Sequence, residues 1–91
     1  MPVTFNLPTV LARLADGRST LDASGTTLRA AVADVSTRYP QLAPRLTGAD
    51  GAPYPFISYY LNDEDARFLG GFDAPVRDGD EVTIVSAVAG G

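Results

Sequence analysis

Three residue types with distinctive chemistry are missing from this chain of 91 residues: histidine, cysteine and lysine. Without histidine or cysteine, the sequence excludes Ser-His-Asp and Cys-His nucleophile arrangements, disulfides, and zinc sites built on thiolate or imidazole. Without lysine, the chain offers no side-chain amine for Schiff-base chemistry or for an isopeptide bond. A metal site made of carboxylates alone is the arrangement left open, and we expect no metal and no bound cofactor.

The basic residues are seven arginines, and 11 acidic residues give a formal net charge of -4. A negative chain is a poor partner for nucleic acid or for an anionic membrane surface. Residues 62–81 hold most of the acidic excess, with Arg67 and Arg77 as their basic residues. This run predicts a solvated acidic face or, alternatively, a surface for a basic partner.

Long apolar runs are also missing, so the sequence contains no candidate for a segment that spans a bilayer. The start of the chain, Met1-Pro2-Val3-Thr4-Phe5, lacks the basic residues and apolar stretch of a signal peptide. We therefore expect a cytoplasmic protein, and the length is typical of one domain.

The first quarter of the chain predicts a hairpin. Residues 3–7 alternate apolar and polar side chains, which is the period of a half-buried strand. Residues 10–14 fit either a helical turn or a second short strand. After the turn signal Asp16-Gly17, residues 19–23 fit a strand with Leu21 and Ala23 facing inward.

An amphipathic helix follows. Ser24, Thr26 or Thr27 can cap its start, and Pro40 disfavours helical geometry beyond Tyr39. Asp34 and Arg38 stand four residues apart and can pair on the solvent side. The apolar positions recur at spacings of three and four, which predicts a single buried face: Leu28, Ala31, Val32, Val35 and Tyr39.

The second half of the chain predicts further strands. Residues 41–55 are rich in Pro, Gly and Ala and fit a surface loop, with one helical turn near 44–46. Residues 56–61 fit a strand, and residues 81–85 fit the last strand. The segments between them predict a turn at 62–65, a short strand at 66–68, a bend at 69–72 and a turn at 78–80. The expected inward residues are Ile57, Tyr59, Leu61, Val82 and Ile84.

Two strands, one helix and two or three more strands form the α+β order of ubiquitin, the β-grasp fold. We expect a mixed sheet of four to five strands packed on one main helix. This domain is expected to span residues 1–85, followed by a flexible tail at residues 86–91.

The tail ends in Gly90-Gly91. Its six residues reach about 20 Å when extended, and two glycines can enter a channel that any Cβ would block. A terminal pair of glycines also occurs by chance, and a chain end can simply fray. The combination with the preceding β-grasp pattern makes the tail the most specific signal in the sequence.

These segments resemble the ubiquitin-like sulfur carriers of the ThiS/MoaD family, which includes the molybdopterin-synthase small subunit and the thiamine-biosynthesis carrier. Asp78-Gly79-Asp80, the apolar strand and the terminal Gly-Gly are shared widely in that family. The segment 62–71 is most similar to the actinobacterial carriers that feed cysteine synthesis. The matching residues are Asn62-Asp63-Glu64-Asp65, Arg67-Phe68, Gly70-Gly71, Asp78-Gly79-Asp80, Val82 and Ala87-Val88-Ala89-Gly90-Gly91.

The resemblance implies a carrier that partner enzymes act on, rather than an enzyme. An E1-like partner would use ATP to adenylate the Gly91 carboxylate, and a sulfur donor would convert it to a thiocarboxylate. Val88, Ala89 and Gly90 would enter the partners' active sites. The implied acceptor is a pyridoxal-phosphate-dependent cysteine synthase, with a zinc peptidase of the JAMM type releasing the product.

The sequence leaves several alternatives open. The sulfur acceptor could instead belong to molybdopterin, thiamine or natural-product synthesis. The chain could be a ubiquitin-like modifier joined to target amines through Gly91, or a binding module with an inert tail. Phe68, Leu69 and Phe72 are candidates for a partner-docking surface, although Phe68 also suits the core and Phe72 also suits packing under the bend.

Overall fold

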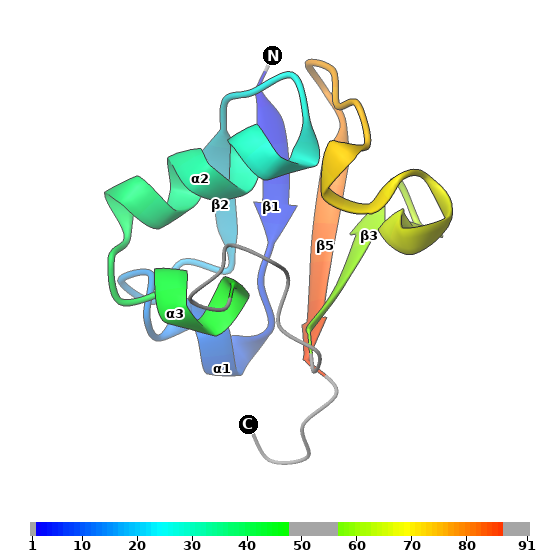
Figure 1. Cartoon of the computed structure of the whole chain (residues 1–91). Helices are drawn as coiled ribbons and strands as arrows, with labels where there is room; N and C mark the ends of the chain where they lie inside the picture. The colour runs from blue at the N-terminus through cyan, green and yellow to red at the C-terminus, as the bar shows by residue number, and fades with distance from the viewer. Residues whose placement is uncertain (1, 48–56, 87–91) are drawn as a thin grey trace.

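The computed structural model describes residues 2–47 and 57–86. Within these ranges, five strands form a mixed sheet in the order β2-β1-β5-β3-β4, and α2 crosses one face of it (Figure 1). The strands are β1 (Val3–Asn6), β2 (Thr20–Ala23), β3 (Ile57–Leu61), β4 (Glu64–Asp65) and β5 (Glu81–Ser86). This arrangement confirms the expected β-grasp fold.

The N-terminal hairpin is present, and its inward residues are those the alternation predicts. β1 pairs antiparallel with β2, so that Phe5 lies opposite Leu21 and Val3 opposite Ala23. All four side chains are buried. The segment between the strands, where the sequence allowed a helix or a strand, forms the short helix α1 (Thr9–Ala12).

The main helix α2 (Leu28–Arg38) begins and ends where the sequence indicates. Thr27 caps it, because its Oγ1 accepts a hydrogen bond from the Ala30 N–H at 3.2 Å. The chain reaches the helix through Gly25, where a Cβ would lie 2.7 Å from the Ala31 nitrogen, so the close approach requires glycine. The buried face of α2 is the predicted one, and Tyr39, at the C-terminal end of the helix, is partly buried.

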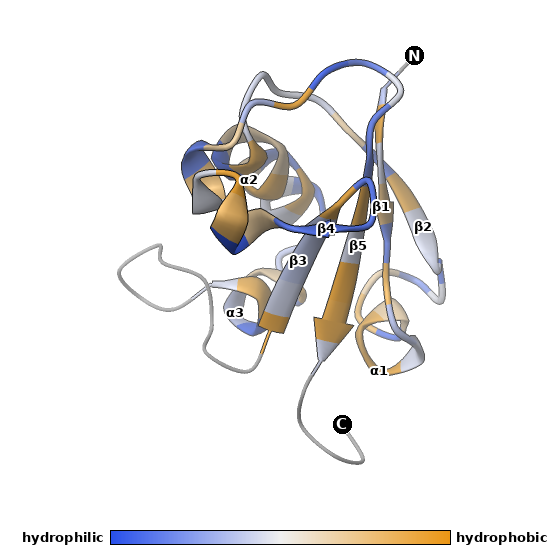
Figure 2. Cartoon of the chain, turned by 90° about the vertical axis from the view of Figure 1, so that its right-hand side faces the viewer, coloured by the Kyte–Doolittle hydropathy of each residue, from blue (hydrophilic) through white to orange (hydrophobic). Residues whose placement is uncertain are grey.

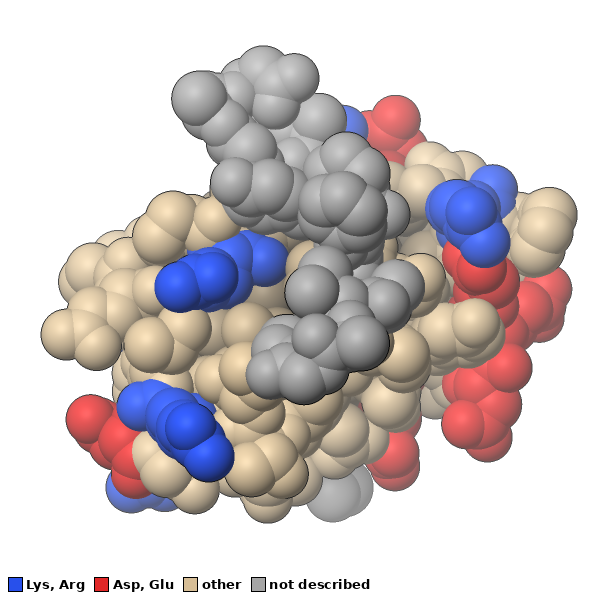
Figure 3. All heavy atoms as spheres, turned by 90° about the horizontal axis from the view of Figure 1, so that it is seen from below, with Lys and Arg blue, Asp and Glu red and all other residues tan. Residues whose placement is uncertain are grey.

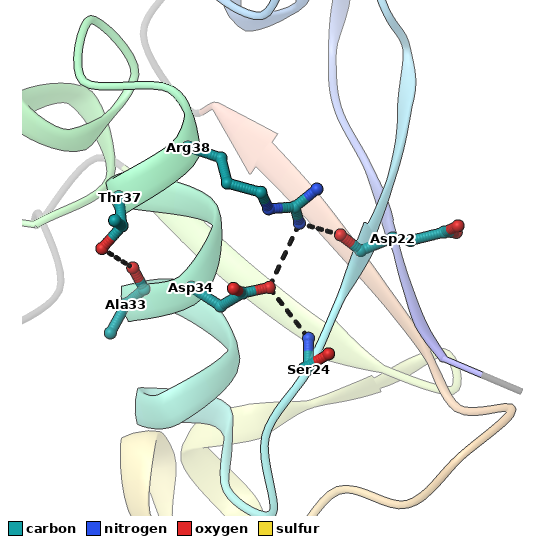
Figure 4. Close-up of polar contacts among 6 residues, drawn as sticks. All are labelled: Asp22, Ser24, Ala33, Asp34, Thr37 and Arg38. Atoms are coloured by element: carbon teal, nitrogen blue, oxygen red, sulfur yellow. Dashed lines mark hydrogen bonds and ion pairs between the residues drawn. The ribbon is translucent and has the colours of Figure 1, made fainter.

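Asp34 and Arg38 bind each other and also bind backbone groups of residues outside the helix. Asp34 Oδ2 accepts hydrogen bonds from the Ser24 N–H at 3.0 Å and from Arg38 at 3.2 Å (Figure 4). Arg38 also donates to the Asp22 carbonyl oxygen. Because Asp22 belongs to β2, at the edge of the sheet, the pair fastens α2 to backbone groups along that edge.

The helix α3 (Ala43–Leu46) is the turn expected near Pro44, but the prediction of a surface loop is wrong for its apolar residues. Leu42 and Leu46 are both 0% exposed. The Tyr59 hydroxyl donates a hydrogen bond of 2.9 Å to the Leu46 carbonyl oxygen, which joins α3 to β3. In the side view of Figure 2, α3 and α2 lie on the same side of the sheet. Residues 48–56 of the predicted loop lie outside the described residues.

The segment after β3 differs from the sequence-based expectation. Residues 64–65, predicted as part of a turn, pair with β3 as β4. Ala66–Phe68, predicted as a short strand, forms the 3₁₀ helix η1, and Gly71–Asp73 forms a second one, η2. The Asp65 side chain accepts the Arg67 N–H at 2.9 Å, and this local bond favours a helical turn over an extended strand.

The described helices are all short, and none of them has the length and apolar character needed to cross a membrane.

Candidate functional site at the end of β5

The residues expected to carry chemistry, Val88, Ala89, Gly90 and Gly91, lie outside the described residues. The structure does describe the base from which this tail starts. β5 continues through Ser86, which pairs with Ile57 of β3, one residue further than the predicted end of the strand. Ser86, which the sequence analysis assigned to the tail, therefore belongs to β5.

β5 is held on both sides within the sheet. It runs parallel to β1 from Glu81 to Thr83 and antiparallel to β3 from Val82 to Ser86. Val82 is 0% exposed and Ile84 is 2% exposed, so the inward side chains anchor the strand in the core. Because β5 is central and anchored, the point where the tail starts is fixed relative to the rest of the domain.

The start of β5 is fixed by a second set of contacts, at the turn Asp78-Gly79-Asp80. Asp80 Oδ2 accepts the Arg77 N–H at 2.9 Å, and its Oδ1 accepts the Asn62 side-chain amide at 3.1 Å. These hydrogen bonds, first that from Arg77 and then that from Asn62, hold the pKa of the Asp80 carboxyl below its ordinary value. Gly79 has φ +89°, a conformation that favours glycine in the turn.

The acidic run after β3 has a structural role at Asp65. This side chain is 9% exposed and forms an ion pair of 2.7 Å with Arg67. The side-chain hydrogen bond from Arg67, together with the Arg67 backbone N–H, lowers the pKa of Asp65. Over residues 2–47 and 57–86, no three Asp or Glu side chains gather closely enough to hold a metal ion.

The three candidate docking residues lie in different environments. Phe68 is 78% exposed and Leu69 is partly buried against the core. Phe72 is 6% exposed, and its ring meets the ring of Tyr59 edge-on at 5.2 Å between centroids. The expectation of an exposed Phe72 is therefore wrong, and the alternative of packing under the bend is correct.

Val85 was not singled out from the sequence, although the alternation that places Val82 and Ile84 inward also places Val85 on the opposite face. It is 43% exposed and stands one residue before the end of β5. Among the described residues, Phe68 and Val85 are the large hydrophobic side chains that face solvent. An exposed apolar side chain thus lies one residue before the end of β5.

The geometry of residues 2–47 and 57–86 defines a β-grasp domain whose central strand β5 ends at Ser86, directly before the segment Ala87-Val88-Ala89-Gly90-Gly91 in the sequence. Residues 6–91 match the model of the ThiS family. The chain belongs to the ThiS family.

Individual members of the family show how close the likeness is. The chain is 42% identical to the sulfur carrier protein CysO of Mycobacterium tuberculosis, over the whole of both chains. Its structure is similar to a chain of the BexX/CysO complex of Amycolatopsis orientalis, with a TM-score of 0.89, 42% identity, and coverage of 98% of this chain and 99% of that chain. It also resembles the small archaeal modifier protein SAMP1 of Haloferax volcanii, with a TM-score of 0.80 and 28% identity over all of both chains.

Proposed function

We propose that this chain is a sulfur carrier whose Gly91 carboxylate is converted to a thiocarboxylate and then donates its sulfur to a biosynthetic acceptor. The observation that carries the proposal is the full-length identity of 42% to CysO sulfur carriers. The fold supports it, because the central strand β5 presents the tail from a fixed base. The protein would act in the cytoplasm as a substrate of partner enzymes rather than as an enzyme.

Two reactions would load the tail. A carboxylate oxygen of Gly91 attacks the α-phosphorus of ATP on an E1-like partner, and pyrophosphate leaves. Sulfide then attacks the acyl carbon of the adenylate, and AMP leaves with the bonding electron pair. A persulfide donor would instead form an acyl disulfide, which a second thiol must cleave by reduction. In either case the product is nucleophilic at sulfur when ionised, as a thiolate is.

The partners follow from the resemblance of residues 62–71 to the carriers for cysteine synthesis. The acceptor would be a pyridoxal-phosphate-dependent cysteine synthase, and a zinc peptidase of the JAMM type would release the cysteine. The Amycolatopsis orientalis relative forms a complex with BexX, which supports direct docking of this fold on a partner protein. Phe68, with Leu69 beside it, is the candidate docking contact on the flank of the domain.

A second function has support from one observation. SAMP1 of Haloferax volcanii is named as a small archaeal modifier protein, and one structure of it covers the whole of this chain. A modifier would use the same adenylated Gly91 but transfer it to an amine on a target protein. The product distinguishes the two functions: a modifier forms conjugates of higher mass, whereas a carrier forms a thiocarboxylate.

A reconstituted loading reaction tests the proposal. The purified chain is incubated with the E1-like enzyme of its host, ATP and sulfide, and its intact mass is measured. We expect replacement of one oxygen by sulfur, dependent on ATP and absent after deletion of Gly91. A chain that stays a plain carboxylate under these conditions contradicts the carrier function, and conjugates to target amines favour the modifier.

A further inference from the structure

Three exposed arginines lie at the same end of the sheet as the last residue of β5. β1 runs parallel to β5, so α1 and Arg13, which follow β1, lie at the end where β5 finishes. Arg18 precedes β2, whose first residue Thr20 pairs with Asn6 at the end of β1. We call Arg13, Arg18 and Arg45 the basic rim.

Arg45 joins this group through α3. The adjacent residue Leu46 is bound through its carbonyl oxygen to Tyr59, and two residues before Tyr59 is Ile57, the partner of Ser86. In Figure 1, α1, α3 and the tip of β5 lie at one end of the molecule. Figure 3 shows that end, with basic side chains on two sides of an uncharged surface and acidic side chains at its edges.

The basic rim is not neutralised by the described part of the chain. Residues 7–19 and 42–47, which build this end, hold the three arginines and one carboxylate, Asp16. Arg29, Arg38 and Arg67 each pair with a carboxylate. Within residues 2–47 and 57–86, none of the three rim arginines forms an ion pair or a side-chain hydrogen bond, so a partner would not have to break one.

The opposite end of β5 carries the opposite charge. β3 ends and β5 begins at this end of the sheet, where the Asn62 Oδ1 accepts a hydrogen bond from the Glu81 N–H. Residues 62–64, which follow β3, and residues 77–81, which lead into β5, build this end of the sheet, and Arg77 is their one basic residue. Their acidic residues are Asp63, Glu64, Asp78, Asp80 and Glu81. Within the described residues, the charge is thus polarised along β5, with the positive end at Ser86.

We propose that the basic rim docks on an acidic protein surface that surrounds the tail-binding channel of the adenylating partner. The inference rests on the proposed function, and it adds the chemistry of the surface that recognises the carrier. Complementary charge raises the rate of encounter, and the polarity of the domain orients it so that the tail approaches first. A long polyanion such as nucleic acid fits less well, because the net charge of -4 repels it.

The test compares loading kinetics of the full chain with those of charge-neutral variants. Arg13→Gln, Arg18→Gln and Arg45→Gln are made singly and together, and Arg77→Gln is the matched control at the acidic end. KM for the carrier and kcat are measured for thiocarboxylate formation by the E1-like enzyme at about 50 mM and about 300 mM salt, because salt screens exposed charges.

We expect the triple variant to raise KM by about tenfold or more at low salt with kcat unchanged, and the difference to shrink at high salt. Each single variant should account for roughly two- to fourfold, and Arg77→Gln should not raise KM. The denaturation midpoint of the triple variant should match the wild type, since all three side chains are exposed.

Three results would overturn the inference. The first is a triple variant with the KM of the wild type, and the second is an equal rise in KM for Arg77→Gln. The third is binding of the wild type to a single-stranded oligonucleotide that the triple variant loses while its loading KM is unchanged, which assigns the rim to nucleic acid. A wild type that is not loaded at all is a different failure, because it overturns the proposed function and this inference with it.

Discussion

Asn62 and Asp80 lie 18 residues apart in the sequence, yet their side chains form a hydrogen bond of 3.1 Å that joins the end of β3 to the start of β5. Asn62 Oδ1 also accepts the Glu81 N–H at 2.9 Å. Two segments that mark the family resemblance, 62–65 and 78–80, therefore meet in one structural contact. Their role is to hold the central strand that leads to the tail.

The first prediction concerns Asn62, which has φ +51°, a left-handed conformation. Asn62→Ala removes the hydrogen bonds to Asp80 and Glu81 and places a less suitable residue in that conformation, so it should lower the free energy of unfolding by about 1–3 kcal/mol. Asn62→Gly loses the same bonds without the backbone strain and should cost less than Asn62→Ala. Urea denaturation measures both, and equal stability of Asn62→Ala and the wild type would contradict the role.

The second prediction separates two phenylalanines. Phe72→Ala should destabilise the domain by about 3–5 kcal/mol, because the ring is buried against Tyr59. Phe68→Ala should change stability by no more than about 0.5 kcal/mol, because that ring is exposed. If Phe68 is a docking contact, its variant should raise KM for loading while the fold stays intact. An unchanged KM would remove Phe68 from the docking surface.

The third prediction concerns acid. The pKa values of Asp65 and Asp80 are lower in the folded chain than the ordinary 3.8, so the unfolded chain binds protons more readily near pH 4. Their contribution to stability is present above that pH and is lost as the pH falls through the lowered values. Urea titrations from neutral to acidic pH should show this loss. Asp65→Asn and Asp80→Asn should be less stable at neutral pH and lose less on acidification; an acid limb as steep as that of the wild type would be evidence against the assignment.

The fourth prediction concerns Tyr59, whose hydroxyl binds the Leu46 carbonyl oxygen. Burial raises the pKa of Tyr59, so the folded chain resists loss of this proton. This contribution is present below the ordinary value of 10.0 and is lost as the pH rises toward the raised value. Tyr59→Phe should cost about 1–2 kcal/mol at neutral pH, because it leaves the Leu46 carbonyl oxygen unpaired. The variant should also lose less stability than the wild type in alkali, as followed by denaturation from pH 7 upward; parallel curves would contradict the assignment.

The elements with a strong period were predictable from the sequence. Leu28 to Val35 follow the helical spacing, and Val82 and Ile84 follow the strand alternation, because burial of one face imposes each pattern. Leu42 and Leu46 were missed as core residues, since the Pro- and Ala-rich segment around them carries no period and their burial depends on tertiary packing, including the contact of α3 with α2 and of Leu46 with Tyr59. The 3₁₀ turn at Ala66 depends on the side chain of one residue, Asp65, which a pattern of apolar residues does not register.

Part of the candidate site could likewise be predicted from the sequence, and part of it could not. Gly90 and Gly91 stand out in the sequence because the pair follows directly on the strand pattern of a β-grasp domain. The basic rim is not visible there, because Arg45 stands more than two dozen residues from Arg18 and only the sheet topology brings them to one end. A cluster of charged residues of this kind can be identified only when the order and direction of the strands are known.

The most direct test of the carrier function is the state of Gly91 in the cell. The protein is purified natively from its own host, and its intact mass is measured with and without a reagent that alkylates thiocarboxylates. We predict a population with one oxygen replaced by sulfur, which reacts with the reagent and is absent when Gly91 is deleted. A terminus that is always a plain carboxylate, in cells actively assimilating sulfur, would contradict the account.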